Sequence, residues 1–121
     1  MAHVLIVDDS PTEVYILKTM LEKHGHRTSA AGNGTEAVSL ARQEHPDVVL
    51  MDIVMPGISG FQATRLLNKD PATSSIPVIV VTTKDQEADK VWALRQGARD
   101  YIVKPVFETD LIAKIQTALG G

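Results

Sequence analysis

The chain contains no cysteine, and this absence already narrows what can hold it together. A chain of 121 residues buries roughly two-thirds of its unfolded surface, so it needs neither disulfides nor a structural metal. A cysteine-free sequence also fits a reducing compartment. Its length and composition predict a single globular domain over residues 1–121.

An excess of positive charge and a long apolar run are missing as well. The chain has 12 Lys and Arg residues against 15 Asp and Glu, a net charge of -3, and no basic block, so we expect no nucleic-acid partner. No apolar run approaches the ~20 residues of a membrane span. Residues 1–5 also lack the basic region and cleavage site of a secretion signal. We therefore expect a cytoplasmic protein with no membrane partner.

Short apolar runs alternate with helical patterns along the chain. Four continuous, mostly β-branched runs predict strands that are buried on both faces: residues 4–7, 48–51, 78–81 and 101–103. A weaker run at residues 27–30 predicts an edge strand. Because parallel strands are joined by right-handed crossovers, this alternation predicts five βα units in a doubly wound α/β sheet with helices on both faces.

Capping residues indicate where the helices begin and end. Ser10 and Glu13 predict a capping box, and Pro11 suits the first helical position between them. Ser59 and Gln62 predict a second capping box. The other expected boundaries are helix ends at Gly25 and Gly97, a cap at Asp85 and a flexible loop over residues 70–75.

Polar or charged residues end each of the four clear strands. Asp8 and Asp9 follow the first strand, and Asp52, Thr82 and Lys104 follow the others. In an open α/β sheet, ligands bind outside the carboxyl ends of the strands, so these five residues should share one crevice. The alternative is that these residues only cap helices and keep the loops soluble. Chemically reactive side chains after all four strands make that interpretation weaker.

The residue types in this crevice favour phosphoryl chemistry. Three neighbouring carboxylates repel one another, by about 4 kcal/mol for a pair about 4 Å apart at an effective dielectric constant of 20. A hard divalent cation such as Mg²⁺ offsets that repulsion through oxygen ligands, and Lys104 supplies a further positive charge. A carboxylate can then act as the nucleophile and form an aspartyl phosphate.

The same motifs resemble the receiver domain of two-component response regulators. They are residues 7–10, residues 52–57 with Gly60, residues 81–83 and residues 101–105. The resemblance covers essentially the whole chain. It implies a five-stranded parallel sheet in the CheY-like and flavodoxin-like order 2-1-3-4-5, and a receiver domain without an output domain of its own.

The resemblance also implies a magnesium site and a phosphoryl acceptor. Asp52 would accept the phosphoryl group. Asp9 and Asp52 would ligate Mg²⁺ together with the backbone carbonyl of Val54, and Asp8 would act largely through water. The chain would then be a phospho-accepting switch, with self-phosphorylation and self-dephosphorylation activity, and not an enzyme in the ordinary sense.

Four further residues receive roles from the resemblance. Thr82 and Lys104 would contact the phosphoryl oxygens, and the peptide bond from Lys104 to Pro105 would be cis. Tyr101 would be the switch partner of Thr82, turning inward as Thr82 moves toward the phosphoryl group. The surface of the fourth helix, fifth strand and fifth helix would change with it. The only tryptophan, Trp92, is predicted on that fourth helix, where it suits a core position and a partner contact equally well.

The expected partners are a histidine kinase as phosphoryl donor and a downstream protein on the surface of the fourth helix, fifth strand and fifth helix. Residues 21–26, 60–65 and 82–86 narrow the resemblance to regulators of twitching motility, in a pilus or chemotaxis-like pathway.

One alternative is a phosphate sink that drains a kinase shared with another regulator. A phosphatase of the haloacid-dehalogenase type is disfavoured, because Val54 stands where its acid/base Asp belongs. A flavin or nucleotide carrier is disfavoured because Asp8 and Asp9 would repel a phosphate.

Overall fold

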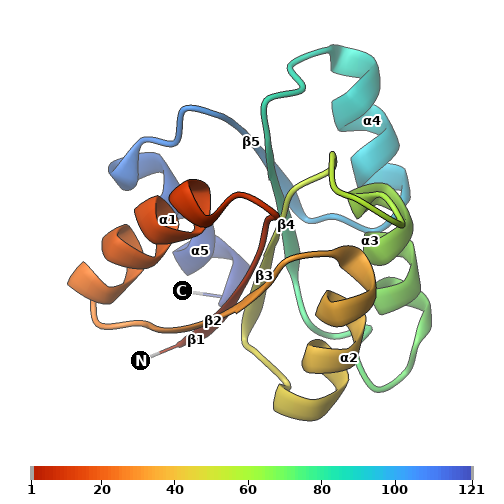
Figure 1. Cartoon of the computed structure of the whole chain (residues 1–121), viewed down its shortest axis with the longest axis horizontal. Helices are drawn as coiled ribbons and strands as arrows, with labels where there is room; N and C mark the ends of the chain where they lie inside the picture. The colour runs from red at the N-terminus through yellow and green to blue at the C-terminus, as the bar shows by residue number, and fades with distance from the viewer. Residues whose placement is uncertain (1, 121) are drawn as a thin grey trace.

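Five strands and five helices alternate in the computed structural model, which describes residues 2–120 (Figure 1). The strands are β1 (His3–Val7), β2 (Arg27–Ala31), β3 (Val48–Met51), β4 (Val78–Thr82) and β5 (Asp100–Val103). The helices are α1 (Pro11–Lys23), α2 (Gly34–Glu44), α3 (Gly60–Lys69), α4 (Glu87–Arg95) and α5 (Glu108–Ala118). None of the helices in this described part is long and apolar enough to cross a membrane.

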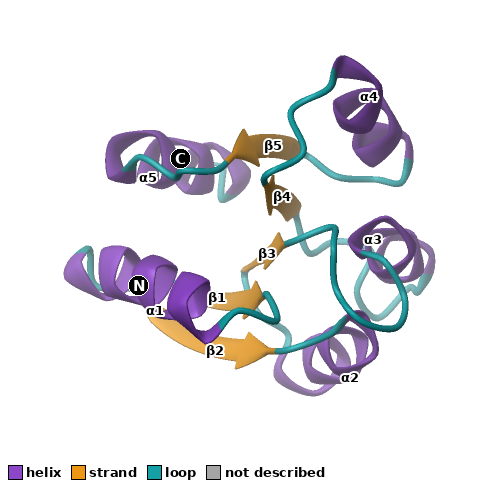
Figure 2. Ribbon diagram, turned by 45° about the horizontal axis from the view of Figure 1, so that its top comes forward, coloured by secondary structure: helices purple, strands orange, loops and turns teal. Residues whose placement is uncertain are grey.

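The strands form one parallel sheet in the order β2-β1-β3-β4-β5, which confirms the expected fold class. The weak run at residues 27–30 is indeed an edge strand. Helices α1 and α5 cover one face of the sheet, and α2, α3 and α4 cover the other (Figure 2). The strand order in the sheet places β1 and β3 side by side, so the loops that follow them are neighbours as well.

Both faces of the central strands are buried, which explains their continuous apolar runs. In β1, Val4 and Ile6 pack with α1 and α5 in one core cluster. Leu5 and Val7 pack with α2 and α3 in the other. Successive side chains of a strand point to opposite faces, so a strand covered on both sides needs apolar residues at every position.

One of the two expected capping boxes is complete. At the start of α3, the amide of Gln62 donates to Ser59 Oγ at 3.2 Å, and the amide of Ser59 donates to Gln62 Oε1 at 2.9 Å. At the start of α1, the amide of Glu13 donates to Ser10 Oγ at 3.3 Å. The amide of Ser10, however, donates to Asp8 Oδ1 at 2.9 Å, so the expected box is only half formed.

One other local expectation is wrong. Asp85 does not cap α4: the N-cap is Gln86, one residue later, and it makes no side-chain cap hydrogen bond. Residues 70–75 form turns anchored by Thr73, which is 1% exposed and whose hydroxyl donates to the carbonyl of Leu67 at 2.7 Å; the flexibility expected of this segment stays a prediction. The expected helix ends do carry left-handed glycines, with φ of 84° at Gly25 and 110° at Gly97.

Candidate functional site at the carboxyl ends of the strands

Three carboxylates meet at the carboxyl end of the sheet. Asp8 and Asp9 directly follow β1, and Asp52 directly follows β3, the strand paired with β1. One oxygen from each of the three lies within 4.8 Å of the others. Asp8 is 4% exposed and Asp52 is 8% exposed, whereas Asp9 faces solvent. The structure therefore brings together the three acidic residues that the sequence proposed.

Lys104 reaches into this cluster from the end of β5. Its ammonium Nζ lies 2.7 Å from Asp8 Oδ2 and 3.4 Å from Asp52 Oδ2, and its side chain is 9% exposed. Burial acts to lower the pKa of Lys104, but the hydrogen bond to Asp8 and the nearby carboxylate charges outweigh it and raise that pKa. Lys104 is therefore a permanent cation at the site.

The cluster fits a hard divalent cation. Within the described residues, Lys104 is the one cation in salt-bridge contact with Asp8 and Asp52, and Asp9 makes no salt bridge. Two oxygen ligands of an octahedral Mg²⁺ lie roughly 3–4 Å apart, so small side-chain rotations from the present separations would suffice. The donor set consists of carboxylate oxygens, which Mg²⁺ prefers to nitrogen or sulfur.

The backbone around Asp52 is fixed by a close approach of α3. The amide of Ile53 donates to Asp52 Oδ1 at 2.7 Å, and the amide of Gly60 donates to the carbonyl of Ile53 at 2.9 Å. A Cβ at position 60 would lie 1.9 Å from the carbonyl oxygen of Asp52. Only glycine fits there, so the start of α3 helps to set the position of Asp52.

Thr82 and Tyr101 lie on the neighbouring strands β4 and β5. Thr82 is completely buried, and its hydroxyl accepts a long hydrogen bond of 3.5 Å from the amide of Lys84. The Tyr101 hydroxyl donates to the carbonyl of Lys84 at 2.8 Å. Burial, followed by the charges of nearby aspartates, raises the pKa of Tyr101 to about 12.

The structure shows where Tyr101 lies before any phosphoryl transfer. Tyr101 is 8% exposed and packs in a cluster with Val80 and Ala93, and its expected turn upon phosphorylation stays a prediction. Small residues make the room, since Ala93 of α4 and Ala98 of the following loop are both buried in that cluster. Any change at Tyr101 must start from this buried position.

The two remaining residues of the expected site lie in loops. Val54 stands in the loop between β3 and α3 with 59% of its surface exposed, and a role for its carbonyl stays a prediction. The peptide bond between Lys104 and Pro105 is cis. The sequence missed one residue altogether: Glu13 Oε2 lies 3.9 Å from Lys104 Nζ. No sequence signal marked it, because the capping box already explained a Glu at that position.

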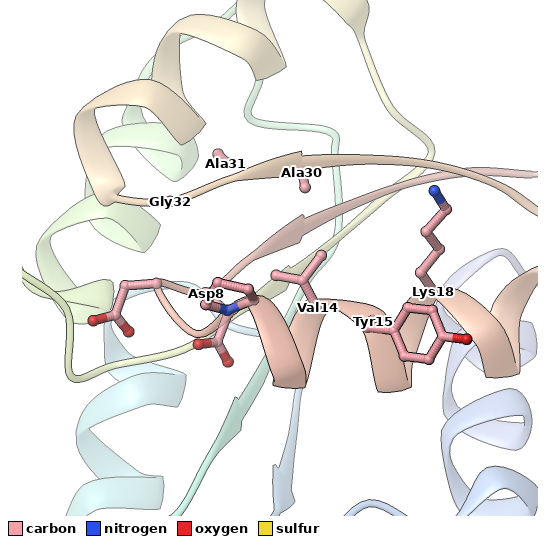
Figure 3. A pocket seen from close by; sticks show the side chains of 9 residues that line it. Asp8, Val14, Tyr15, Lys18, Ala30, Ala31 and Gly32 are labelled. Atoms are coloured by element: carbon pink, nitrogen blue, oxygen red, sulfur yellow. The ribbon is translucent and has the colours of Figure 1, made fainter.

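An open groove runs from the acidic cluster between α1 and β2. It has a volume of about 430 Å³ and is lined at one end by Asp8 and Asp9. Figure 3 shows Val14 and Tyr15 of α1 along the groove, opposite the small side chains of β2, with Lys18 at the far end. The acidic cluster is therefore reached from an open surface and does not lie at the bottom of an enclosed pocket.

The fold and this site define a class of protein. The sequence pattern of the response regulator receiver domain matches residues 4–116, and the chain belongs to that family. Its function is thus of the two-component signalling type, in which receiver domains interact with histidine kinases and bind Mg²⁺ at an acidic pocket.

Among curated proteins, the chain is 68% identical to Protein PilH of Pseudomonas aeruginosa over 121 residues, which is 100% of both sequences. Among solved structures, it superposes on the chemotaxis protein CheY4 of Vibrio cholerae with a TM-score of 0.92 and 28% identity, covering 98% of this chain and 99% of the other. It also superposes on the receiver domain of a sensor histidine kinase from Pseudomonas aeruginosa, with a TM-score of 0.91, 28% identity and coverage of 99% and 98%. That protein has a magnesium ion coordinated in its active-site cleft.

Proposed function

We propose that the chain is a phosphorylation-dependent switch in which Asp52 accepts a phosphoryl group from a histidine kinase. The observation that carries this proposal is the surroundings of Asp52. Asp52 is 8% exposed, and its carboxylate lies within 4.8 Å of two other carboxylates and 3.4 Å from a buried ammonium. A nucleophilic carboxylate with a cation beside it is suited to receive a phosphoryl group.

In the proposed reaction, an oxygen of Asp52 forms a bond to phosphorus while the P–N bond of the donor phosphohistidine breaks and the imidazole leaves. Asp8, Asp9, Asp52 and the carbonyl of Val54 would hold Mg²⁺, which supplies neutralisation of the transferred charge. Lys104 would move its ammonium from Asp8 to a phosphoryl oxygen. The hydroxyl of Thr82 would donate to another phosphoryl oxygen.

The exposed apolar side chains of α4 support the proposed output surface on α4, β5 and α5. On this helix, Val91 is 41% exposed, Trp92 is 49% exposed and Leu94 is 44% exposed, while on β5 Val103 is 42% exposed. Exposed apolar groups that lie close together are typical of interaction surfaces, and three of these four fall within four residues of the chain on α4. The exposure of Trp92 thus favours a partner contact over a core position, and we propose a downstream protein as that partner.

The likeness to PilH supports a pathway of the twitching-motility type, and it leaves the switch and phosphate-sink roles to experiment. A haloacid-dehalogenase-type phosphatase gains no support, because Val54 carries no acid/base group and is exposed to solvent.

The cytoplasm is the proposed location, as the composition suggested, and fractionation of cells expressing the protein at its natural level would test it.

Phosphotransfer from candidate histidine kinases to purified protein is the direct test. Wild type should take up label from radioactive kinase, and Asp52→Asn, which keeps the side-chain shape, should take up essentially none. Asp110→Asn removes one carboxylate from the outer part of α5 and should behave like wild type. Labelling of Asp52→Asn at the wild-type rate would show that the phosphoryl acceptor has been misassigned.

A further inference from the structure

Glu13 does not make the contact that its position in α1 leads one to expect. In a capping box its carboxylate would accept from the amide of Ser10, but that amide donates to Asp8 Oδ1 at 2.9 Å. The Glu13 carboxylate instead faces the site, where its Oε2 lies 3.9 Å from Lys104 Nζ. The side chain of Glu13 is 32% exposed, so it is only partly surrounded by water.

Lys104 is consequently shared among three carboxylates from three parts of the chain. Its Nζ is 2.7 Å from Asp8, 3.4 Å from Asp52 and 3.9 Å from Glu13. Of these, Asp8 and Asp52 belong to the cluster that fits a divalent cation. Glu13 lies outside that cluster, on the first turn of α1, and would remain available to Lys104 when the two aspartates are engaged.

We propose that Glu13 is a positioning residue that holds the Lys104 ammonium toward α1 and opposes its transfer to a phosphoryl group on Asp52. This inference rests on the proposed function of Asp52. Two physical effects act in the same direction. Glu13 competes with the phosphoryl oxygens for one cation, and its negative charge repels an incoming phosphoryl anion. Glu13 therefore lowers the rate at which the acceptor is filled.

The variant that tests this role is Glu13→Gln. It removes the charge and keeps the size of the side chain, and the cap of α1 survives because the amide of Glu13, not its side chain, bonds Ser10 Oγ. The matched control is Glu22→Gln, which makes the same charge change at an exposed position near the other end of α1. Glu13→Asp keeps the charge but shortens the side chain by one methylene group.

The first measurement is phosphoryl uptake from acetyl phosphate, in which the Asp52 oxygen–phosphorus bond forms as the P–O bond of the donor breaks and acetate leaves. We expect Glu13→Gln to raise the second-order rate constant by about three- to tenfold, Glu13→Asp to lie between it and wild type, and Glu22→Gln to match wild type. Equal rates in Glu13→Gln and wild type, or a slower Glu13→Gln, would overturn the proposal. No uptake by wild type would instead count against the proposed function.

The second measurement needs neither Mg²⁺ nor phosphoryl transfer. The side-chain ammonium of Lys104 is followed by ¹⁵N-correlated NMR in the metal-free protein and assigned by its loss in Lys104→Arg. Glu13→Gln should shift this resonance, and Glu22→Gln should leave it in place. A resonance that is identical in wild type and Glu13→Gln would show that the two side chains are not coupled, which also overturns the proposal.

Discussion

Replacing Gly60 by Ala should weaken both the fold and the phosphoryl acceptor, because the new methyl group meets backbone and not a mobile side chain. An ideal Cβ at this position lies 1.9 Å from the carbonyl oxygen of Asp52 and 2.8 Å from Ile53 Cα. Ordinary contact requires more than about 3 Å, so α3 or the end of β3 must move by about 1 Å. Helix α3 is anchored by fully buried residues such as Ala63 and Leu67, which resist that movement.

The expected cost follows from what the movement breaks. The hydrogen bond of 2.9 Å from the amide of Gly60 to the carbonyl of Ile53 is strained or lost, at about 1 kcal/mol. Overpacking adds about 1–3 kcal/mol, and the better helix propensity of Ala returns less than about 1 kcal/mol. Gly60→Ala should therefore lower the free energy of unfolding by about 2–3 kcal/mol, or the Tm by about 10 °C.

Urea unfolding followed by circular dichroism measures this change, and phosphoryl uptake measures the displacement of Asp52. Gly32→Ala is the control, because a Cβ there meets nothing within 4 Å and the backbone is not left-handed. It should stay within about 0.5 kcal/mol of wild type. If Gly60→Ala also stays within that range and takes up phosphoryl normally, the close approach of α3 does not fix Asp52.

Four other outcomes follow from the site. Mg²⁺ at about 100 times its Kd should stabilise wild type by about 2.7 kcal/mol, seen as a higher Tm in thermal unfolding, and Asp52→Asn should gain less; equal gains would place the ion elsewhere. The pKa of Tyr101 is raised from 10.0 to about 12, so its neutral form stabilises the fold below pH about 10. That contribution, about 3 kcal/mol, should fade as the pH rises toward 12, and the difference in absorbance titration between wild type and Tyr101→Phe should show the late ionisation. Mg²⁺ alone should change Trp92 fluorescence little, because the residue after Asp52 is aliphatic, whereas a phosphoryl mimic should change it more; strong quenching by Mg²⁺ contradicts this. Loss of phosphoryl label in the absence of kinase should be slow, since Val54 cannot orient water, and about tenfold faster in Val54→Asn; decay of wild type within seconds would suit a phosphate sink instead.

The sheet could be predicted from the sequence because its strands are buried on both faces. Runs such as residues 48–51 leave no polar position, so the strand is recognised without knowledge of its neighbours. The sequence signal for the edge strand β2 is weaker because Thr28, Ser29 and Ala30 are small or polar. The convergence of Asp8, Asp52 and Lys104 follows from topology, since parallel strands all end at the same edge of the sheet.

Two of the differences from the sequence-based expectations arise because a residue outside the expected local pair intervenes. Glu13 satisfies every local condition for a capping box, but Lys104, far along the chain, draws its carboxylate away, and Asp8 takes the amide of Ser10. The buried position of Tyr101 likewise depends on the small side chain of Ala93, which another element supplies. The contact between Glu13 and Lys104 and the packing of Tyr101 against Ala93 each join two separate elements. No pattern within a single element therefore predicts either of them.

The buried position of Tyr101 also limits which element can carry a signal away from Asp52. Tyr101 is held at both ends, by its core cluster and by the hydrogen bond of 2.8 Å to the carbonyl of Lys84. Helix α4 is held far less firmly, since Ala93 is the one buried residue within its bounds, and burying a methyl group contributes only about 1 kcal/mol. Phosphoryl contact at Thr82 would pull on the segment that carries Lys84 and leads directly into α4. We therefore predict that α4 moves more than the tyrosine ring does, and that a partner would contact the exposed apolar residues of α4.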